Sequence, residues 1–451
     1  MILTEARATL TLALPIVGTQ LAQIAIHTTD VLLLARLSEH ALAVGALTFG
    51  LFSFFWLVGT GLAMAVAPIA AQAIGHDASD RASVRDSVHD GLIVSLGFSI
   101  VAGLLLWSCE PFLVWFGQPP ELIPDTLLFL RLLSLAMLPT LGFVVLRSFT
   151  AALSRPRPAM VLMILAVGLN ALLVYGLAFG ALGFPALGIL GAGIGSASAN
   201  WIVFLVFAAY VAWDRQFGSY HLWRGIFRSS RRRLAEYLRI AGPIALTFGS
   251  EIGLFSLAAQ LMGRLGASEV AAHQIALQWA SISFMVPMGI AQAATVRVGL
   301  SIGARDHTGA VRAGWIAIAL GVGFMAAMAF VFWFAGAELV GLFVADATST
   351  VFALAVAYLG IAAMFQLVDG AQAVANGALR GLKDTRVPMI LAAVAYWGIG
   401  MPLGAGLGLG LGWGPRGMWV GLIAGLTFAA VLLCVRFVRS SHPDRLMMRG
   451  P

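Results

Sequence analysis

Twelve apolar stretches, each long enough to cross a lipid bilayer, follow one another along this chain of 451 residues. A helix of about 20 residues crosses the hydrocarbon core of a bilayer, which is about 30 Å thick. Hydrophobic residues make up 60% of the chain and charged residues only 10%, which is more apolar surface than a water-soluble core can bury. The sequence therefore predicts an all-α integral membrane protein with twelve transmembrane helices.

The second half of the chain repeats the first at a nearly constant spacing. Pro15 and Arg36 of the first stretch align with Pro243 and Arg264 of the seventh, Tyr237–Leu265, at a shift of about 228. Further matches in the same order pair Gly75 with Gly303, Arg157 with Arg386, Gly191 with Gly417 and Gly195 with Gly421. Two halves of six spans each begin on the same side of the membrane. This predicts two six-helix bundles related by a pseudo-two-fold axis along the membrane normal.

The expected domains follow from the same division. They are an N-terminal six-helix bundle (1–213), a basic cytoplasmic linker (214–236), a C-terminal six-helix bundle (237–438) and a cytoplasmic tail (439–451). Most of the 27 Lys and Arg residues lie in the connections that follow even-numbered stretches, which places both termini in the cytoplasm. The Arg-over-Lys bias, with Lys383 as the single lysine, indicates a GC-rich bacterial genome, and the expected location is the bacterial inner membrane.

The positive charge of the chain does not indicate a nucleic-acid partner. The arginines lie between apolar stretches, where they orient the helices in the membrane. The run Arg228–Leu234 in the linker is read as a topology signal in contact with lipid headgroups, with regulator binding as the alternative. Cys109 and Cys434 form no disulfide framework or metal set, and no cofactor is expected. A monomer in the lipid bilayer is expected.

Three carboxylates lie inside the apolar stretches: Asp30 in the first, Glu251 in the seventh and Asp369 in the tenth. A charged side chain at the bilayer centre costs at least about 2.5 to 3.5 kcal/mol, so such residues usually have a function. Arg131 is the only base placed well inside a stretch, so the expected counter-charge is a mobile cation, Na⁺ or H⁺. Similar depths predict that Glu251 and Asp369 share a site. A protonated Glu251, hydrogen-bonded inside its bundle, is the alternative.

Polar and aromatic side chains accompany these acids. Gln23 and His27 lie on the helical face of Asp30, and His27 is either its titrating partner or an interhelical hydrogen-bonding group. The remaining accessory amides are Asn170, Asn200 and Gln278. Aromatic residues that offer cation–π and apolar surface to a guest are Phe55, Trp56, Trp279, Phe284 and Phe365, with plain packing as the alternative for each.

Motifs for chemistry on a substrate are missing from the sequence. It contains no phosphate-binding loop, no His-Glu-x-x-His and no Gly-x-Ser-x-Gly, so an enzyme is not expected. Pro15 and Pro243 stand at equivalent positions ahead of an acid and are assigned a mechanical role in helix bending. The glycine ladders around Gly404 and Gly421 predict close contact between helices.

The segments LALPIVGTQLAQ, PIALTFGSEIGLFSLAAQLMGRLG and ANGALRGLKDTRVPM, with HQIAL opening the eighth stretch, resemble the multidrug and toxic compound extrusion (MATE) transporters of the NorM-like branch. The resemblance covers essentially the whole chain. It implies an antiporter that exports cationic, amphipathic drugs and toxins in exchange for Na⁺ or H⁺ by alternating access. It also implies that Glu251 and Asp369 bind the cation, with Asp30 as the acid of the N-terminal bundle and Asn170 as its partner.

The sequence departs from the family pattern at three positions. Phe284 and Phe365 stand where relatives often have tyrosines, and Val174 stands where some have a second acid. The identity of the coupling ion therefore stays open.

Two other functions are weighed against drug export. A lipid-linked oligosaccharide flippase of the same superfamily needs a basic cavity for pyrophosphate, whereas the stretches show acids and almost no Arg or Lys. A channel or membrane-embedded enzyme is disfavoured by the two-fold repeat, which suits alternating access.

Overall fold

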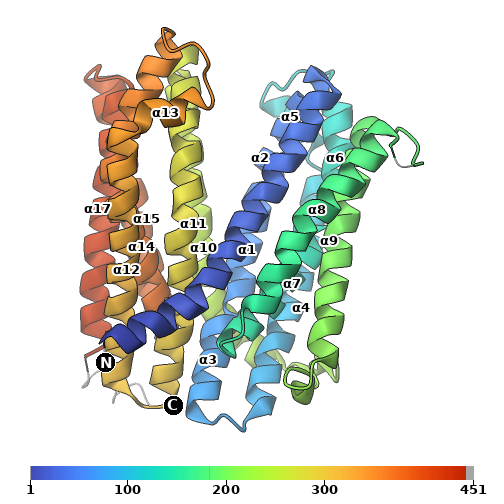
Figure 1. The fold of residues 1–451 in the computed structure, drawn as a ribbon, viewed down its shortest axis with the longest axis vertical. Coiled ribbons are helices and arrows are strands. Elements are labelled where there is room, and N and C mark those ends of the chain that lie inside the picture. The colour runs from blue at the N-terminus through green and yellow to red at the C-terminus, as the bar shows by residue number, and fades with distance from the viewer. Residues whose placement is uncertain (1, 182, 443–451) are drawn as a thin grey trace. The chain divides into compact units, whose positions relative to one another are not determined.

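The computed structural model describes residues 2–181 and 183–442, and these residues form helices joined by short connections (Figure 1). The first half contains α1 (Ile2–Leu37), α2 (Glu39–Met64), α3 (Val66–His76), α4 (Arg81–Trp107), α5 (Glu110–Trp115), α6 (Ile123–Ser134), α7 (Met137–Ala152), α8 (Arg157–Phe179), α9 (Gly188–Trp213), η1 (Gly218–Tyr220) and η2 (Ile226–Arg228). The second half contains α10 (Arg231–Gly263), α11 (Ala267–Gly303), α12 (His307–Phe334), α13 (Gly336–Gly341), α14 (Thr350–Gly381), α15 (Arg386–Ala393), the π-helix η3 (Val394–Gly400), α16 (Met401–Ala405), the π-helix η4 (Gly406–Gly410) and α17 (Pro415–Ser440).

Twelve helical segments of the described chain are long and apolar enough to span a membrane, as the sequence predicts. Some spans consist of two consecutive helices, such as α2 with α3 and α6 with α7. The all-α, twelve-helix fold class is confirmed. The predicted tail (439–451) is described only to residue 442, so its remainder lies outside the described residues.

The chain forms two compact units whose boundaries differ from the expected ones. The C-terminal unit contains the chain start through Val17, Gly75–Asp77, and the chain from Leu246 onward. The N-terminal unit contains Gly18–Ile74 and Ala78–Ala245. This division differs from the expected bundles, 1–213 and 237–438, at their first helices.

Helix length and local contacts explain this difference. Helices α1 and α10 have 36 and 33 residues, more than one membrane crossing requires. Near the start of α1, Glu5 forms a bidentate ion pair with Arg297 of α11, both within the C-terminal unit. Early in α10, the Tyr237 hydroxyl donates to the Leu62 carbonyl, both within the N-terminal unit. Each helix changes unit two residues after its repeat-related proline, Pro15 or Pro243.

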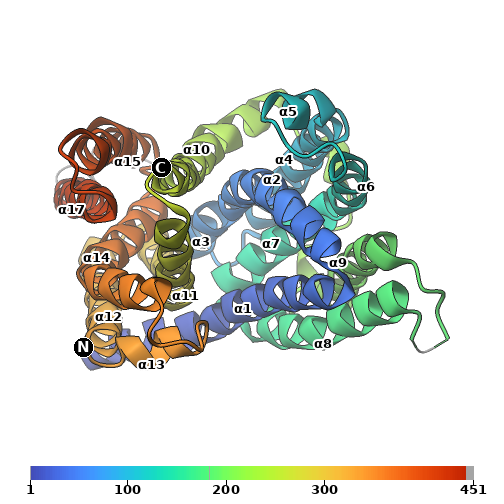
Figure 2. The ribbon, with the colours of Figure 1, turned by 90° about the horizontal axis from the view of Figure 1, so that it is seen from above.

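Helix α14 lies at the centre of the C-terminal unit and packs against α11, α12 and α17 (Figure 2). Glycine makes these contacts close. A Cβ on Gly377 of α14 would lie 2.3 Å from the Ala291 carbonyl oxygen of α11. A Cβ on Gly421 of α17 would lie 2.3 Å from Gly404 of α16, which confirms the predicted glycine contact there.

The repeat is visible in how equivalent helices begin. Asp80 caps α4 by accepting a hydrogen bond from the Ser83 amide, and Asp306 caps α12 by accepting one from the Gly309 amide. These caps satisfy backbone donors that lack a partner within the helix. The short charged loops that follow Gly75 and Gly303 in sequence therefore serve the same structural purpose.

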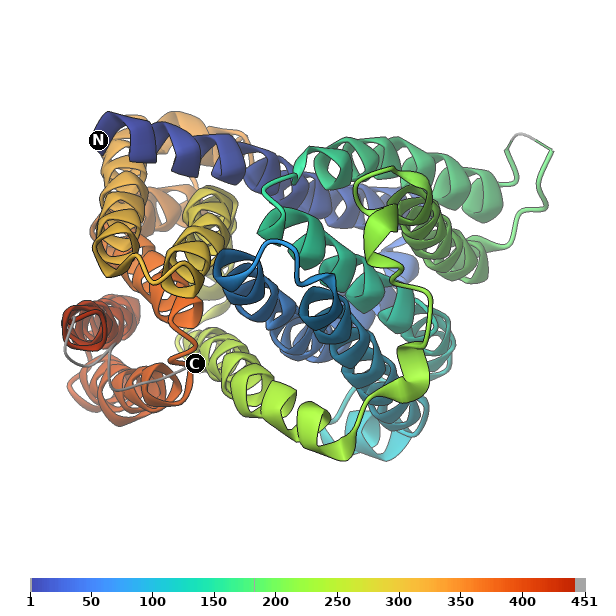
Figure 3. The ribbon, with the colours of Figure 1, turned by 90° about the horizontal axis from the view of Figure 1, so that it is seen from below.

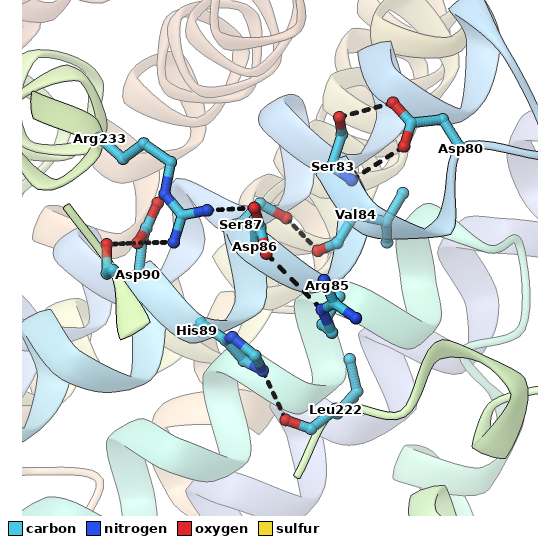
Figure 4. A network of polar contacts seen from close by, with 11 residues as sticks. Asp80, Ser83, Val84, Arg85, Asp86, Ser87, His89, Asp90, Leu222 and Arg233 are labelled. Carbon is cyan, nitrogen blue, oxygen red and sulfur yellow. Dashed lines mark hydrogen bonds and ion pairs between the residues drawn. The ribbon is translucent and has the colours of Figure 1, made fainter. Parts of the chain in front are cut away.

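The linker lies across the end of α4 in the N-terminal unit (Figure 3). Arg233 donates to Asp86 and lies 3.8 Å from Asp90 (Figure 4). Asp90 also accepts a hydrogen bond from Ser229. The His89 ring contacts the Leu222 carbonyl at 2.6 Å. The basic run is therefore more than a topology signal, because part of it is fixed by acids of α4. Helix α10 begins at Arg231, inside the range expected for the linker (214–236).

Candidate functional site

Polar side chains meet in the C-terminal unit where α10, α14 and η3 face one another. Asp369 of α14 is buried, and Glu251 of α10 is partly buried. The two carboxylates interact electrostatically, and the amide of Gln372 lies between them. Gln372 Nε2 is 3.3 Å from Asp369 Oδ1 and within hydrogen-bonding reach of Glu251. Glu251 and Asp369 therefore lie together, as their depths predict.

Tyr396 supplies a hydroxyl to this cluster from η3. Its Oη atom donates to Gln372 Oε1 at 2.9 Å, which orients the amide so that Nε2 faces the carboxylates. The expected family tyrosine is absent at position 365, and Tyr396 provides a phenol from another helix. Neither Gln372 nor Tyr396 is among the site residues predicted from the sequence. Gln372 could have been found, because it follows Asp369 by three residues on one helical face, whereas Tyr396 required the tertiary structure.

Arg380 lies near Glu251, which corrects the expectation that the two acids have no basic neighbour. The sequence places Arg380 in a connection, but it belongs to the last turn of α14 and is only 7% exposed. Its guanidinium carbon lies 5.0 Å from the centre of the Phe248 ring, one turn from Glu251 on α10. It interacts electrostatically with Glu251. The length of the apolar stretch does not show that α14 continues past it, so the sequence alone could not place Arg380 on the helix.

The N-terminal unit contains a second polar cluster around the buried Asp30. Asn170 Nδ2 of α8 donates to Asp30 Oδ1 at 2.5 Å, and Ser196 Oγ of α9 donates to Oδ2 at 3.2 Å. Asn200 is one turn from Ser196 and donates to its carbonyl at 2.8 Å. Close approach of α8 and α9 permits this arrangement, since a Cβ on Gly195 would lie 2.9 Å from Val174 Cα. The structure thus brings Asp30, Asn170 and Asn200 together.

A small cavity adjoins this second cluster. Its volume is about 20 Å³, about the size of one water molecule. It is lined by amide side chains, aromatic rings and apolar groups: Gln23, Ile26, Trp56, Pro139, Thr140, Phe143, Val144, Met163, Ala166, Asn170, Ala199, Asn200 and Val203. Gln23 and Trp56 therefore lie near Asn170.

His27 lies apart from Asp30. Its exposed side chain packs edge to face on Phe49, with ring centres 4.8 Å apart. It lines a separate cavity of about 280 Å³ between α1 and α2. Among the described residues, the hydrogen-bond partners of Asp30 are Asn170 and Ser196. Of the two interpretations of His27, the structure does not bring its ring to Asp30, because a spacing of three leaves the ring free to turn toward a neighbouring helix.

Most of the aromatic candidates pack against protein. Phe365 is 2% exposed and lies between Phe255 and Trp419, which contradicts a role as a cavity wall in this conformation. Trp279 donates to the Leu339 carbonyl at 3.2 Å. Phe55 packs against the core of the N-terminal unit. Phe284 is partly buried and Gln278 is exposed, and neither belongs to the two carboxylate clusters.

The Asp of the motif LRGLKDT has a structural role. Asp384 accepts hydrogen bonds from Arg436 Nε and Ser440 Oγ of α17, each at 2.8 Å. These contacts attach the connection after α14 to the last helix. Among the described residues, no group of three or more His, Cys, Asp or Glu side chains could hold a metal ion.

A family model called MatE matches the chain twice, over residues 15–176 and 243–405. The two matches begin at the paired prolines and confirm the internal repeat. Proteins named "Probable multidrug resistance protein NorM" are similar over almost the whole chain. The one from Mesorhizobium japonicum is 44% identical, covering 96% of this chain and 94% of its own. The one from Brucella suis is 41% identical, covering 95% of this chain and 92% of its own. The one from Pseudomonas aeruginosa is 38% identical, covering 96% of this chain and 89% of its own.

Solved structures share the fold. A eukaryotic MATE transporter has a TM-score of 0.86 at 20% identity, covering 99% of both chains. An outward-facing multidrug resistance MATE family transporter has a TM-score of 0.87 at 20% identity, covering 98% of this chain and 96% of its own. The family-model match and the sequence identity together establish that this chain belongs to the MATE transporter family, in its NorM-like branch.

Proposed function

We propose that this protein is a secondary active multidrug efflux antiporter, which exports cationic amphipathic compounds in exchange for Na⁺ or H⁺. The observation that carries the proposal is the pair Glu251 and Asp369, two carboxylates joined through the amide of Gln372 inside an apolar bundle. Two such groups repel each other unless a cation or a proton lies with them. Relatives named for multidrug resistance support drugs as the cargo.

The coupling follows from linkage between cation and cargo. One conformation binds the cation well and the cargo poorly, and another has the opposite preference. Exchange between the two conformations therefore couples the movement of the cation to that of the cargo. A cation moving inward down a potential of about 100 mV supplies roughly 2.3 kcal/mol per charge. We place both termini and the linker in the cytoplasm of a bacterial inner membrane, because the connections on that side hold most of the arginines.

The structure favours antiport over the flippase. A pyrophosphate group needs several cations at one place, whereas each unit has one buried arginine, Arg147 or Arg380, within the described residues. The arginine in the C-terminal unit lies near the acid Glu251. Its local charge therefore suits a cation better than an anion.

Everted membrane vesicles test the proposal. Efflux of a fluorescent organic cation, driven by an imposed H⁺ or Na⁺ gradient, is expected to fall to background in Glu251→Gln and in Asp369→Asn. Glu338→Gln, which neutralises an exposed acid of the same unit, is the matched control and should transport normally. Gradient-driven efflux that persists in both site variants would refute the proposed coupling.

A further inference from the structure

Two buried acids in the described part of the C-terminal unit have an arginine of their own. Glu5 has its own arginine, Arg297, and Asp384 has Arg436. The cluster that remains contains Glu251 and Asp369 with one arginine, Arg380. With all three groups ionised, this cluster carries a net charge of minus one.

Arg380 is placed to act on the cluster. It follows Asp369 by eleven residues, so it lies on the same face of α14 but roughly 16 Å further along the helix. Of the two acids, Glu251 is the one with which it interacts electrostatically. Its guanidinium covers the face of Phe248, and Phe248 and Glu251 are neighbours on α10. The side chain is more than nine-tenths buried, and its Nε atom has no hydrogen-bond partner within the described chain. A buried guanidinium without its own carboxylate needs nearby negative charge.

The N-terminal unit offers a contrast. Its buried Asp90 pairs with Arg233, which leaves Asp30 and Arg147 as the other buried charges. Arg147 Nη1 donates to Gln20 Oε1 at 2.6 Å, and its Nε also lacks a partner among the described residues. One acid and one arginine sum to zero, so this unit has no net charge to offer a cation.

We propose that Arg380 is the resident counter-charge of the Glu251 and Asp369 cluster and limits it to one bound monovalent cation per transport cycle. The inference rests on the proposed antiport and adds its stoichiometry. Two acids without Arg380 would hold two coupling cations. With Arg380, the fixed guanidinium neutralises one negative charge and a single Na⁺ or H⁺ neutralises the other. The exchange of one coupling cation for one monovalent organic cation then moves no net charge.

Reconstituted protein in liposomes tests this count. The probe is ethidium, a monovalent aromatic cation, with Na⁺ and H⁺ gradients imposed separately and the membrane potential set by K⁺ and valinomycin. In the unmodified protein, one coupling cation is expected per ethidium, and the membrane potential should not alter the gradient at which net flux stops. Arg380→Gln is expected to double the coupling ratio and to make that gradient depend on the potential.

Two further variants separate charge from packing. Arg380→Lys keeps the charge and should keep the ratio of one. Arg147→Gln removes the buried arginine of the other unit and should also leave the ratio unchanged. An active Arg380→Gln protein with the unmodified ratio would overturn the proposal, and so would Arg147→Gln doubling the ratio.

A thermal measurement covers the case in which Arg380→Gln does not transport. Melting temperatures of Glu251→Gln, Arg380→Gln and the double variant form a mutant cycle. If the two charges compensate each other, the double variant loses less than the sum of the single losses, and additive losses would overturn the proposal. Failure of the unmodified protein to move ethidium under either gradient would instead contradict the proposed function, while the cycle still decides whether Arg380 and Glu251 interact.

Discussion

At the scale of single residues, the C-terminal cluster depends on one amide held in one orientation. Gln372 presents its Nε2 toward the two acids because its Oε1 accepts a hydrogen bond from Tyr396. Without that donor, a buried amide oxygen is left unsatisfied, which costs about 1 to 3 kcal/mol. In the proposed antiport, the phenol therefore acts on the cation through Gln372, as a positioning residue.

Tyr396→Phe removes this hydroxyl while keeping the ring. The concentration of the coupling ion at half-maximal transport is expected to rise about tenfold, which corresponds to about 1.4 kcal/mol. Transport at saturating ion should change little. Tyr358→Phe is the control, because Tyr358 is equally buried in α14 but lies outside the cluster. Ion-dependent uptake into vesicles measures this concentration for each variant. An equal rise for Tyr396→Phe and Tyr358→Phe would indicate a general packing effect.

At the scale of helices, glycine decides which side chains can meet. Asn170 and Ser196 reach Asp30 from two helices, α8 and α9, whose backbones nearly touch. A Cβ on Gly191 would lie 2.2 Å from the Leu177 carbonyl oxygen, so any larger residue would separate the helices. The cluster around Asp30 therefore depends on glycines, which let α8 and α9 approach, as much as on the polar side chains themselves.

Gly191→Ala is expected to lower the free energy of unfolding by about 1 to 3 kcal/mol, because backbone atoms must move apart. Gly168→Ala is the control on α8. A Cβ there meets nothing within 4 Å, and alanine favours a helix. Melting of the purified protein in detergent measures both variants. The interpretation fails if Gly168→Ala is the more destabilising change.

At the scale of the whole molecule, arginine is distributed to orient the chain in the membrane. The linker is rich in arginine, and Arg81 and Arg85 stand at the start of α4, next to its connection with α3, while the connection between α5 and α6 and the residues around it carry no base. Our orientation places the linker and the connection between α3 and α4 inside the cell and the connection between α5 and α6 outside.

Labelling of single cysteines in intact cells checks this orientation. In a chain with Cys109 and Cys434 replaced by alanine, a membrane-impermeant thiol reagent should label Glu121→Cys and not Ala78→Cys. Both positions are exposed, so accessibility in the folded protein is matched. Permeabilised cells should show both labelled. The opposite pattern would invert the topology.

The sequence by itself determined the class of the fold, its repeat and the acids. Hydropathy suffices for twelve helices because a backbone in lipid must satisfy its hydrogen bonds within each span. The repeat appears in the chain because Pro15 and Pro243 recur at one shift, and Glu251 and Asp369 stand out because isolated charges in apolar helices are costly.

Tertiary structure alone decided what surrounds those acids. Tyr396, Arg380 and Ser196 come to their clusters from helices that are distant in sequence or extend past the expected span, and His27 turns away from Asp30 to pack on Phe49. Helices α1 and α10 divide between the two units just after a proline, which changed the expected domain boundaries. Periodicity reports which face of one helix is polar, but the packing of neighbouring helices determines what that face meets.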